Sequence, residues 1–307
     1  MKESSDGSET SDLESARKHM DRRCKLFYTI HQVLLLHQGP IHDFTLSMDA
    51  HHTCFEIDQI ILHLSRNHAV KKLTFDFCYY DMYKPIFNGF VNLTNLSFTC
   101  GKISRKALLH LLSNCPSLKS LSLFILENDF IGSEYPSIME LFKCLPVIED
   151  LTTTWVDTIA PLVKASVPQE LPTSLIHLKY CSIEEILFND GYGLTFVAVL
   201  IKCSPNLEKI VLEMGDDDEI ESDVLEEYSV TLEKYSDVWL EHLKELEIRD
   251  FEYVEPVLEL VKFILVRSPN LKKVKLGAEW VEKNEKLEML KTLKCAPHAS
   301  PVEIVVD

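Results

Sequence analysis

Histidine and cysteine are the side chains in this chain that could bind a metal ion or attack a substrate. The 307-residue sequence holds 12 histidines and nine cysteines. His51 is adjacent to His52, and His63 lies near His68, but neither pair belongs to an HExxH motif or to a Cys/His cluster at zinc spacing. We therefore expect no metal site and interpret His63 and His68 as residues of a helix end and a loop.

Glycine spacing and possible nucleophiles also give no sign of catalysis. Gly191-Tyr192-Gly193 lacks the third glycine of a dinucleotide-binding fingerprint and the lysine of a P-loop, so it is interpreted as a turn before a helix. No GxSxG elbow is present for a serine nucleophile. Cys115, Cys144 and Cys203 lie just before expected strands, where a small apolar residue suits a tight corner. The sequence predicts no enzyme activity and no cofactor.

The charge balance and the cysteine pattern limit the partners and the compartment. There are 48 acidic and 31 basic residues, and the formal net charge of −17 repels nucleic-acid phosphates and anionic lipid surfaces. The cysteines are odd in number, scattered, and never in a CxxC pair, which favours reduced thiols. Residues 1–15 have no apolar core of a secretory signal. We expect a cytoplasmic or nuclear protein, or both, with no nucleic-acid partner and no membrane partner.

The elements that must position any site are indicated by an internal repeat. Apolar residues recur with the spacing LxxLxL, and successive copies lie 23 to 36 residues apart, about 29 on average. This period is at the upper end of the range for leucine-rich repeats. The middle residues of the copies are Phe44, Leu73, Leu96, Leu121, Leu151 (in a degraded copy), Leu178, Ile210, Leu246 and Val274, and a final alternating run follows at Val302, Ile304 and Val306. For the sixth copy we take the triplet Leu175, Leu178 and Tyr180.

The apolar period changes between these copies, and this change predicts the fold. Residues at i and i+2 point to one side of a strand, whereas the segments between copies have helical spacing, for example Ile57, Ile60, Ile61 and Leu64. Several helical segments end just before a proline, such as Pro116 and Pro269. The predicted fold is an α/β leucine-rich-repeat solenoid, a horseshoe with a parallel concave sheet and helices on the convex side.

Composition divides the chain into three segments. Residues 1–18 are rich in serine and acidic residues and are predicted to be a disordered tail. Residues 19–240 form the repeat region, which an amphipathic helix containing Phe27 and Val33 would cap. Residues 241–307 form the carboxy-terminal repeats and a closing strand.

The natural binding surface of a solenoid is its concave sheet, where the residues between the buried ones face outward. We predict register pairs of Glu245 with Lys273 and of Glu247 with Lys275 on neighbouring strands. Simple cross-strand charge pairing and contact with a ligand are both open interpretations of these residues. The candidate face comprises Lys72, Thr74, Asp76, Asn95, Ser97, Thr99, Ser120, Ser122, Phe124, Lys209, Val211, Glu213, Glu245, Glu247, Arg249, Lys273 and Lys275.

Three stretches resemble a known family, the plant F-box/FBD/LRR-repeat proteins. The segment from Phe27 to Ile41 looks like the join that opens the repeats in that family. The stretch from His242 to Val274 resembles the FBD module, and the ending Ala299 to Val306 is similar to its closing strand. Members of the family begin with an F-box that docks a Skp-type adaptor of a cullin ubiquitin ligase, and nothing in Met1 to Arg23 matches its LPxxLL-like start.

The resemblance implies a non-enzymatic scaffold similar to the substrate-recognition part of an SCF-type ubiquitin ligase. Its partner would be a protein bound on the concave face, and a Skp-type adaptor would bind only if an F-box lies upstream. The alternative is a small-molecule or hormone sensor that uses the same concave face.

Overall fold

The structure is a computed structural model, and the residues that it describes make up most of the chain. They are residues 6–48, 55–66, 69–76, 89–101, 103–125, 138–160, 163, 175–188, 192–215, 232–235, 237–251, 254–279 and 281–307.

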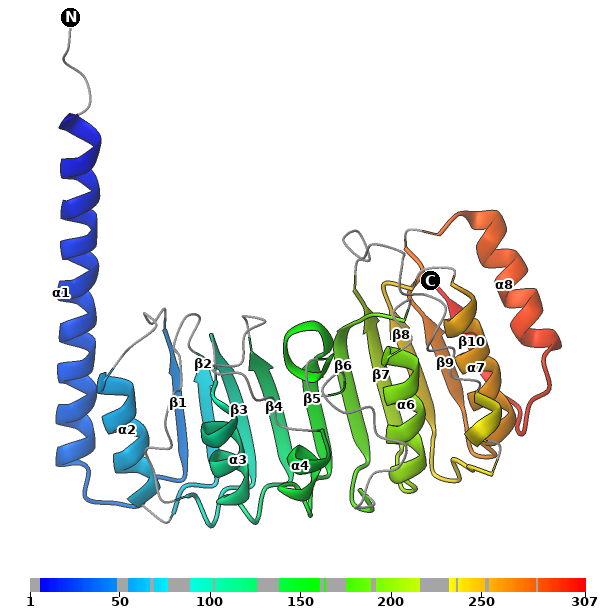
Figure 1. Cartoon of the computed structure of the whole chain (residues 1–307), viewed down its shortest axis with the longest axis horizontal. Coiled ribbons are helices and arrows are strands. Elements are labelled where there is room, and N and C mark those ends of the chain that lie inside the picture. The colour runs from blue at the N-terminus through cyan, green and yellow to red at the C-terminus, as the bar shows by residue number, and fades with distance from the viewer. Residues whose placement is uncertain are drawn as a thin grey trace, which may run out of the picture.

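Ten strands of the described chain form one open sheet in which every neighbouring pair is parallel and the strand order follows the sequence (Figure 1). This architecture confirms the predicted α/β leucine-rich-repeat solenoid. The strands are β1 (Asp43–Ser47), β2 (Lys72–Asp76), β3 (Asn95–Cys100), β4 (Ser120–Ile125), β5 (Asp150–Thr154), β6 (Tyr180–Ile186), β7 (Lys209–Met214), β8 (Glu245–Arg249), β9 (Lys273–Leu276) and β10 (Glu303–Val306).

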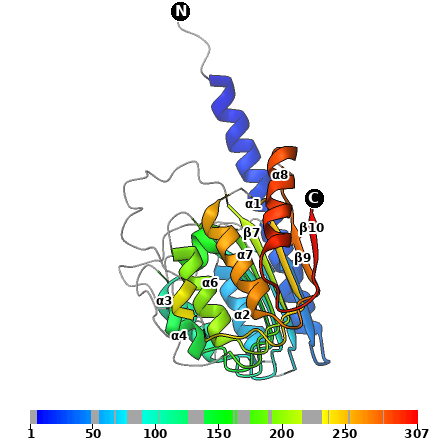
Figure 2. The ribbon, with the colours of Figure 1, turned by 90° about the vertical axis from the view of Figure 1, so that its right-hand side faces the viewer.

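Helices cover one face of this sheet, and α1 lies beside its first strand (Figures 1 and 2). The helices α2, α3, α4, α6 and α7 lie on the covered face, and α8 lies next to β10. The opposite face, called the open face below, is the one predicted to be concave. The bounds are α1 (Asp6–Leu36), α2 (Phe55–Arg66), α3 (Arg105–Ser113), α4 (Ile138–Lys143), the π-helical turn η1 (Trp155–Ile159), α6 (Tyr192–Cys203), the 3₁₀ turn η3 (Leu232–Tyr235), α7 (Glu255–Arg267) and α8 (Lys283–Cys295). No helix in the described ranges is both long and apolar enough to cross a membrane.

Strands β3 to β9 each follow the same backbone turn. In the fourth repeat the N–H of Leu118 donates to the carbonyl of Cys115, and the N–H groups of Lys119 and Ser120 both donate to the carbonyl of Thr94. Equivalent turns recur at Leu93, Ile148, Leu178, Leu207, Leu243 and Leu271. Pro116, Pro146, Pro205 and Pro269 lie in these turns, and α3, α4, α6 and α7 end before them as predicted.

The inner face of the sheet packs on the helices to form one continuous core. Leu96, Leu121 and Leu246 are at most 2% exposed. Aromatic rings also contribute to the core. Phe75 makes edge contacts with Phe44 and Phe98 on the neighbouring strands, and Trp155 of η1 packs against Phe196 of α6 with ring centroids 5.5 Å apart. Because each repeat contributes only a few apolar side chains, the repeats are stable only when stacked.

The sixth triplet was predicted in the wrong register. The buried residues are Leu178, Cys181 and Ile183, and Cys181 aligns with Ile210 of the next strand. Leu175 accepts the turn hydrogen bond from Leu178, so it occupies the position that Cys115 holds in the fourth repeat. The prediction was wrong because Leu175, which lies in the turn, produced a second LxxLxL match. That match assigned Tyr180 to the core, whereas the structure places it on the open face in register with Lys209.

Helix α1 differs from the predicted disordered tail and short capping helix. It is one helix of 31 residues starting at Asp6, so the described part of the expected tail is helical. Leu13 to Met20 contains mostly helix-forming residues and no glycine or proline, which accounts for the continuity. Phe27 and Leu34 are buried, whereas Val33, predicted on the same apolar face, is 59% exposed.

Gly193 has a packing role in the first turn of α6. A Cβ atom built on it would collide with the carbonyl of Leu187, the residue that follows β6. The Gly-Tyr-Gly segment therefore contains a glycine that lets the backbone of a helix approach a strand closely.

Replacing one buried ladder residue tests the shared core. Leu121→Ala leaves a cavity between two repeats, and we expect the free energy of unfolding in urea to fall by about 2–5 kcal/mol. The matched variant Ser122→Ala, on the open face of the same strand, should change it by less than about 0.5 kcal/mol. Equal effects of the two variants would contradict the assignment of the two faces.

Candidate functional site

The in-register strands arrange the outward residues of the open face in rows. One row runs through the first residue of each strand from β2 to β10 and comprises Lys72, Asn95, Ser120, Asp150, Tyr180, Lys209, Glu245, Lys273 and Glu303. A second row, two residues further along, comprises Thr74, Ser97, Ser122, Thr152, Ser182, Val211, Glu247, Lys275 and Val305. The second row changes from hydroxyl side chains on β2–β6 to charged side chains on β8 and β9.

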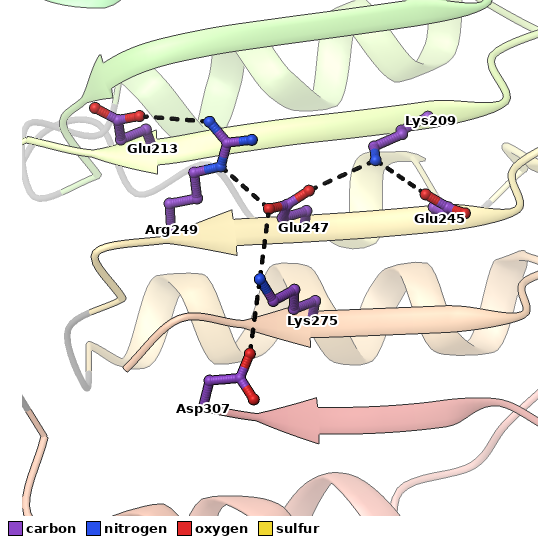
Figure 3. Close-up of polar contacts among 7 residues, drawn as sticks. All are labelled: Lys209, Glu213, Glu245, Glu247, Arg249, Lys275 and Asp307. Carbon is purple, nitrogen blue, oxygen red and sulfur yellow. Dashed lines mark hydrogen bonds and ion pairs between the residues drawn. The ribbon is translucent and has the colours of Figure 1, made fainter. Parts of the chain in front are cut away.

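The charged part of the open face contains a connected set of ion pairs (Figure 3). We call it the charged patch, and its residues are Lys209, Glu213, Glu245, Glu247, Arg249, Lys275 and Asp307. Lys209 Nζ lies 3.0 Å from Glu245 and 3.5 Å from Glu247. Lys275 Nζ lies 3.9 Å from Glu247 and 3.6 Å from Asp307, which extends the set across four strands to the end of the sheet.

Glu247 is the centre of the charged patch. Its carboxylate accepts a hydrogen bond from Arg249 Nε at 3.1 Å, and its side chain is only 16% exposed. Partial burial raises the pKa of Glu247, but the hydrogen bond from Arg249 and the charges of Arg249, Lys209 and Lys275 more than offset this, so the pKa is lowered. Glu247 therefore stays ionised and holds the surrounding cations in place.

Glu213 has the opposite electrostatic environment at the edge of the same patch. Burial raises its pKa, and the charges of Glu184 and Asp250 add to the rise. Arg249 lies 3.9 Å away and offsets only part of this. The carboxyl ends of β6–β8 therefore carry more negative charge than their cations neutralise.

A second charged row precedes the strands, at the position of the entry turns. Glu149 lies between Lys119, at 2.7 Å, and Lys179, at 2.9 Å, and Lys244 pairs with Glu208 further along. Hydrogen bonds from Lys119 and Lys179 lower the pKa of Glu149 from 4.5 to about 2. These pairs join neighbouring repeats outside the rows of the open face.

All seventeen predicted face residues lie on the strands and alternate with buried residues, except that Val211 is itself buried, at 1% exposure. Val211 lies between Lys209 and Glu213 along β7 and in register with Glu247, and all three have longer side chains. The predicted register pairs of Glu245 with Lys273 and Glu247 with Lys275 are confirmed. Glu245, however, makes its ion pair with Lys209 on the other side.

Sequence reasoning missed several residues of the open face. The error in the sixth triplet concealed Tyr180 and Ser182, and the degraded fifth copy concealed Thr152. Asp307 follows the alternation of Glu303 and Val305, so this signal was present in the final run.

The side chains considered first for chemistry lie outside this patch. His63 is in the last turn of α2, whereas His51, His52 and His68 lie outside the described residues. Burial raises the pKa values of Cys115 and Cys181 to about 12, so both thiols are protonated at neutral pH and are poor nucleophiles. Within the described segments no three His, Cys, Asp or Glu side chains come together as a metal site.

Comparison with known proteins assigns this architecture to a family. A family model described as the leucine-rich-repeat domain of At1g61320/AtMIF1 matches residues 137–303, which is more than half of the chain. The chain belongs to this leucine-rich-repeat family. It is also similar to the F-box/FBD/LRR-repeat protein At1g13570 of Arabidopsis thaliana, with 26% identity over 336 positions that cover 88% of this chain and 80% of that protein. Both findings agree with the resemblance to plant F-box/FBD/LRR-repeat proteins. The matched segment includes the whole charged patch except Asp307.

The lowered pKa of Glu149 makes its contribution to stability depend on pH. A carboxylate with a depressed pKa stabilises the fold above about pH 4.5, and this contribution is lost as the pH falls toward about 2. Glu149→Gln should therefore lower the urea midpoint at pH 7, and the difference from the parent chain should shrink between pH 4.5 and 2. A difference that stays constant over this range would contradict the role of the two lysines.

Proposed function

We propose that the chain is a non-enzymatic protein-interaction module and that the charged patch on its open face is the main contact with a protein partner. The observation that carries this proposal is the alternation of charge across β7–β10 on the face without the five repeat helices. A catalytic role would need an activated nucleophile or a general base, and the buried cysteines supply neither.

The geometry of the patch favours specific recognition of a protein. Arg249 and Lys275 each hold ion pairs within the sheet and remain 49% and 44% exposed, so their charged groups are positioned before a partner arrives. Prior positioning reduces the side-chain entropy that binding must remove, and a fixed charge pattern rejects partners with the wrong pattern. Tyr180 lies in register with Lys209, and tyrosine and arginine are frequent at the centres of protein interfaces.

We further propose that this interaction serves substrate recognition in an SCF-type ubiquitin ligase. The support is the similarity to the F-box/FBD/LRR-repeat protein At1g13570 of Arabidopsis thaliana, whose name includes an F-box. A Skp-type adaptor would then bind through an F-box upstream of the repeats. Such a role would place the chain in the cytoplasm or the nucleus.

Neutralising the centre of the patch tests the binding surface. Lys209→Gln combined with Glu247→Gln removes the pattern but keeps hydrogen-bonding side chains of similar size. For a partner identified with the parent chain, we expect affinity measured by calorimetry to fall at least about tenfold, or about 1.4 kcal/mol.

The matched control is Glu149→Gln combined with Lys179→Gln, which makes the same chemical change in the row of entry turns. It should bind the partner as the parent chain does. Similar losses for the two double variants, or none for the patch variant, would contradict the assignment of the open face.

The ligase connection requires a separate test in cells. Raising the level of the chain should increase ubiquitination of the bound partner, and the patch double variant should not. Binding without any change in ubiquitination would contradict the ligase role and leave the interaction role intact.

A further inference from the structure

The outer edge of β10 is one end of the described sheet, and no described strand pairs with the backbone groups on that side. In the described chain β10 pairs with β9 alone, and the N–H groups of Glu303 and Asp307 donate to Lys272 and Leu276 at 2.9 and 3.0 Å. Alternate residues of a parallel strand direct their backbone groups to opposite sides. The N–H and C=O groups of Ile304 and Val306 therefore point away from β9, on the side that faces the viewer in Figure 2.

The inner side chains of β10 are also less covered than those of the preceding strand. Ile304 and Val306 are in register with Val274 and Leu276, which are both fully buried. Ile304 and Val306 pack against the same core but stay partly exposed, although α8 lies next to the strand. The core is therefore open at the place where a further strand would lie.

The charges on β10 indicate what kind of strand would fit there. Glu247, a carboxylate inside the sheet, has cations on both neighbouring strands, Lys209 on β7 and Lys275 on β9. Asp307 pairs with Lys275 at 3.6 Å, and Glu303 is in register with Lys273, both on the β9 side. Lys286 of α8 also lies near the end of β10, where it donates to the backbone carbonyl of Asp307 at 3.0 Å and not to its side chain. On the outer side, the described chain provides no strand that could supply a cation to the side chain of Glu303 or Asp307.

We propose that the outer edge of β10 binds an extended basic segment of a partner protein, which adds to the sheet as its next strand. Pairing would place residues opposite Glu303, Val305 and Asp307 on the open face and residues opposite Ile304 and Val306 over the core. A partner segment that fits this edge would therefore have the residue pattern basic, apolar, any residue, apolar, basic. This edge site is separate from the charged patch proposed above, although Asp307 borders both.

The same charges disfavour a second copy of this chain as the occupant. In antiparallel pairing of two β10 strands centred on Val305, Glu303 of each copy would lie opposite Asp307 of the other. Like charges directly opposite one another destabilise a strand pair, and charged edge residues of this kind limit self-association.

Binding of short labelled peptides to the full chain tests the edge site. The probe is a nine-residue peptide with Lys-Val-Thr-Val-Lys at its centre, and the comparison peptide has Glu at both lysine positions. Fluorescence anisotropy should show the basic peptide binding at least about tenfold more tightly, since two exposed ion pairs differ in sign between the peptides. The variant Glu303→Lys with Asp307→Lys should reverse the preference.

Two matched controls separate strand pairing at this edge from general charge attraction. Asp21→Lys with Glu241→Lys makes the same charge change at exposed positions elsewhere and should keep the preference for the basic peptide. A basic peptide that is N-methylated at the amides facing β10 should lose binding. Reversal by the first control or unchanged binding by the methylated peptide would overturn the proposal.

The peptide experiment also separates a failure of the edge site from a failure of the proposed contact on the open face. The double variant Lys209→Gln with Glu247→Gln should bind the basic peptide as the parent chain does, because the outer edge is unchanged. Loss of peptide binding in that variant would place the peptide on the open face instead and overturn the edge site. Light scattering gives a further test. If the parent chain forms dimers and Glu303→Lys with Asp307→Lys abolishes them, the occupant of the edge is a second copy of this chain, and the proposal is overturned.

Discussion

Burial of apolar side chains between in-register parallel strands is the interaction on which the rest of the structure depends. A single repeat cannot bury Leu121 alone, because the side chain is covered by its own helix and by the inner residues of the strands on either side. A shift of one residue would move the whole apolar set of a strand to the open face, so the core fixes the register. The open face takes its order from this constraint, since each outward residue lies directly beside its counterpart in the next repeat.

The charged patch is a consequence of that register. Lys209, Glu247 and Lys275 are far apart in the sequence, yet successive strands bring both ammonium groups within 3.9 Å of the Glu247 carboxylate. Exposed ion pairs contribute only about 0 to 1 kcal/mol each to stability, so the fold does not depend on them. Their arrangement has more consequence for recognition, where a fixed pattern of charge distinguishes one partner from another. The ion pairs of Glu149 in the entry turns are similar in chemistry but join repeats away from that face.

The sequence predicted the repeat, the parallel sheet and the pairing of Glu247 with Lys275, because these depend on apolar periodicity and strand geometry. It did not predict the position of Tyr180, because Leu175 in a turn imitates a strand leucine. Nor did it predict the contact of Arg249 with Glu213 and Glu247, since side-chain direction within a row depends on conformations that periodicity does not define. Burial of Val211 was missed for the same reason, and the length of α1 was missed because serine and acidic composition outweighed its helix-forming residues.

Cross-linking between engineered cysteines on neighbouring strands tests the central claim about register most directly. Ser97→Cys with Ser122→Cys places two thiols in register on β3 and β4, where parallel strands lie about 4.8 Å apart. A short thiol-specific cross-linker, with the linked peptides mapped by mass spectrometry, should join this pair much faster than Ser97→Cys with Phe124→Cys, which is two residues out of register. Equal or faster linking of the second pair would show that the strands are not stacked as described, and the row of charges on the open face would then have no structural basis.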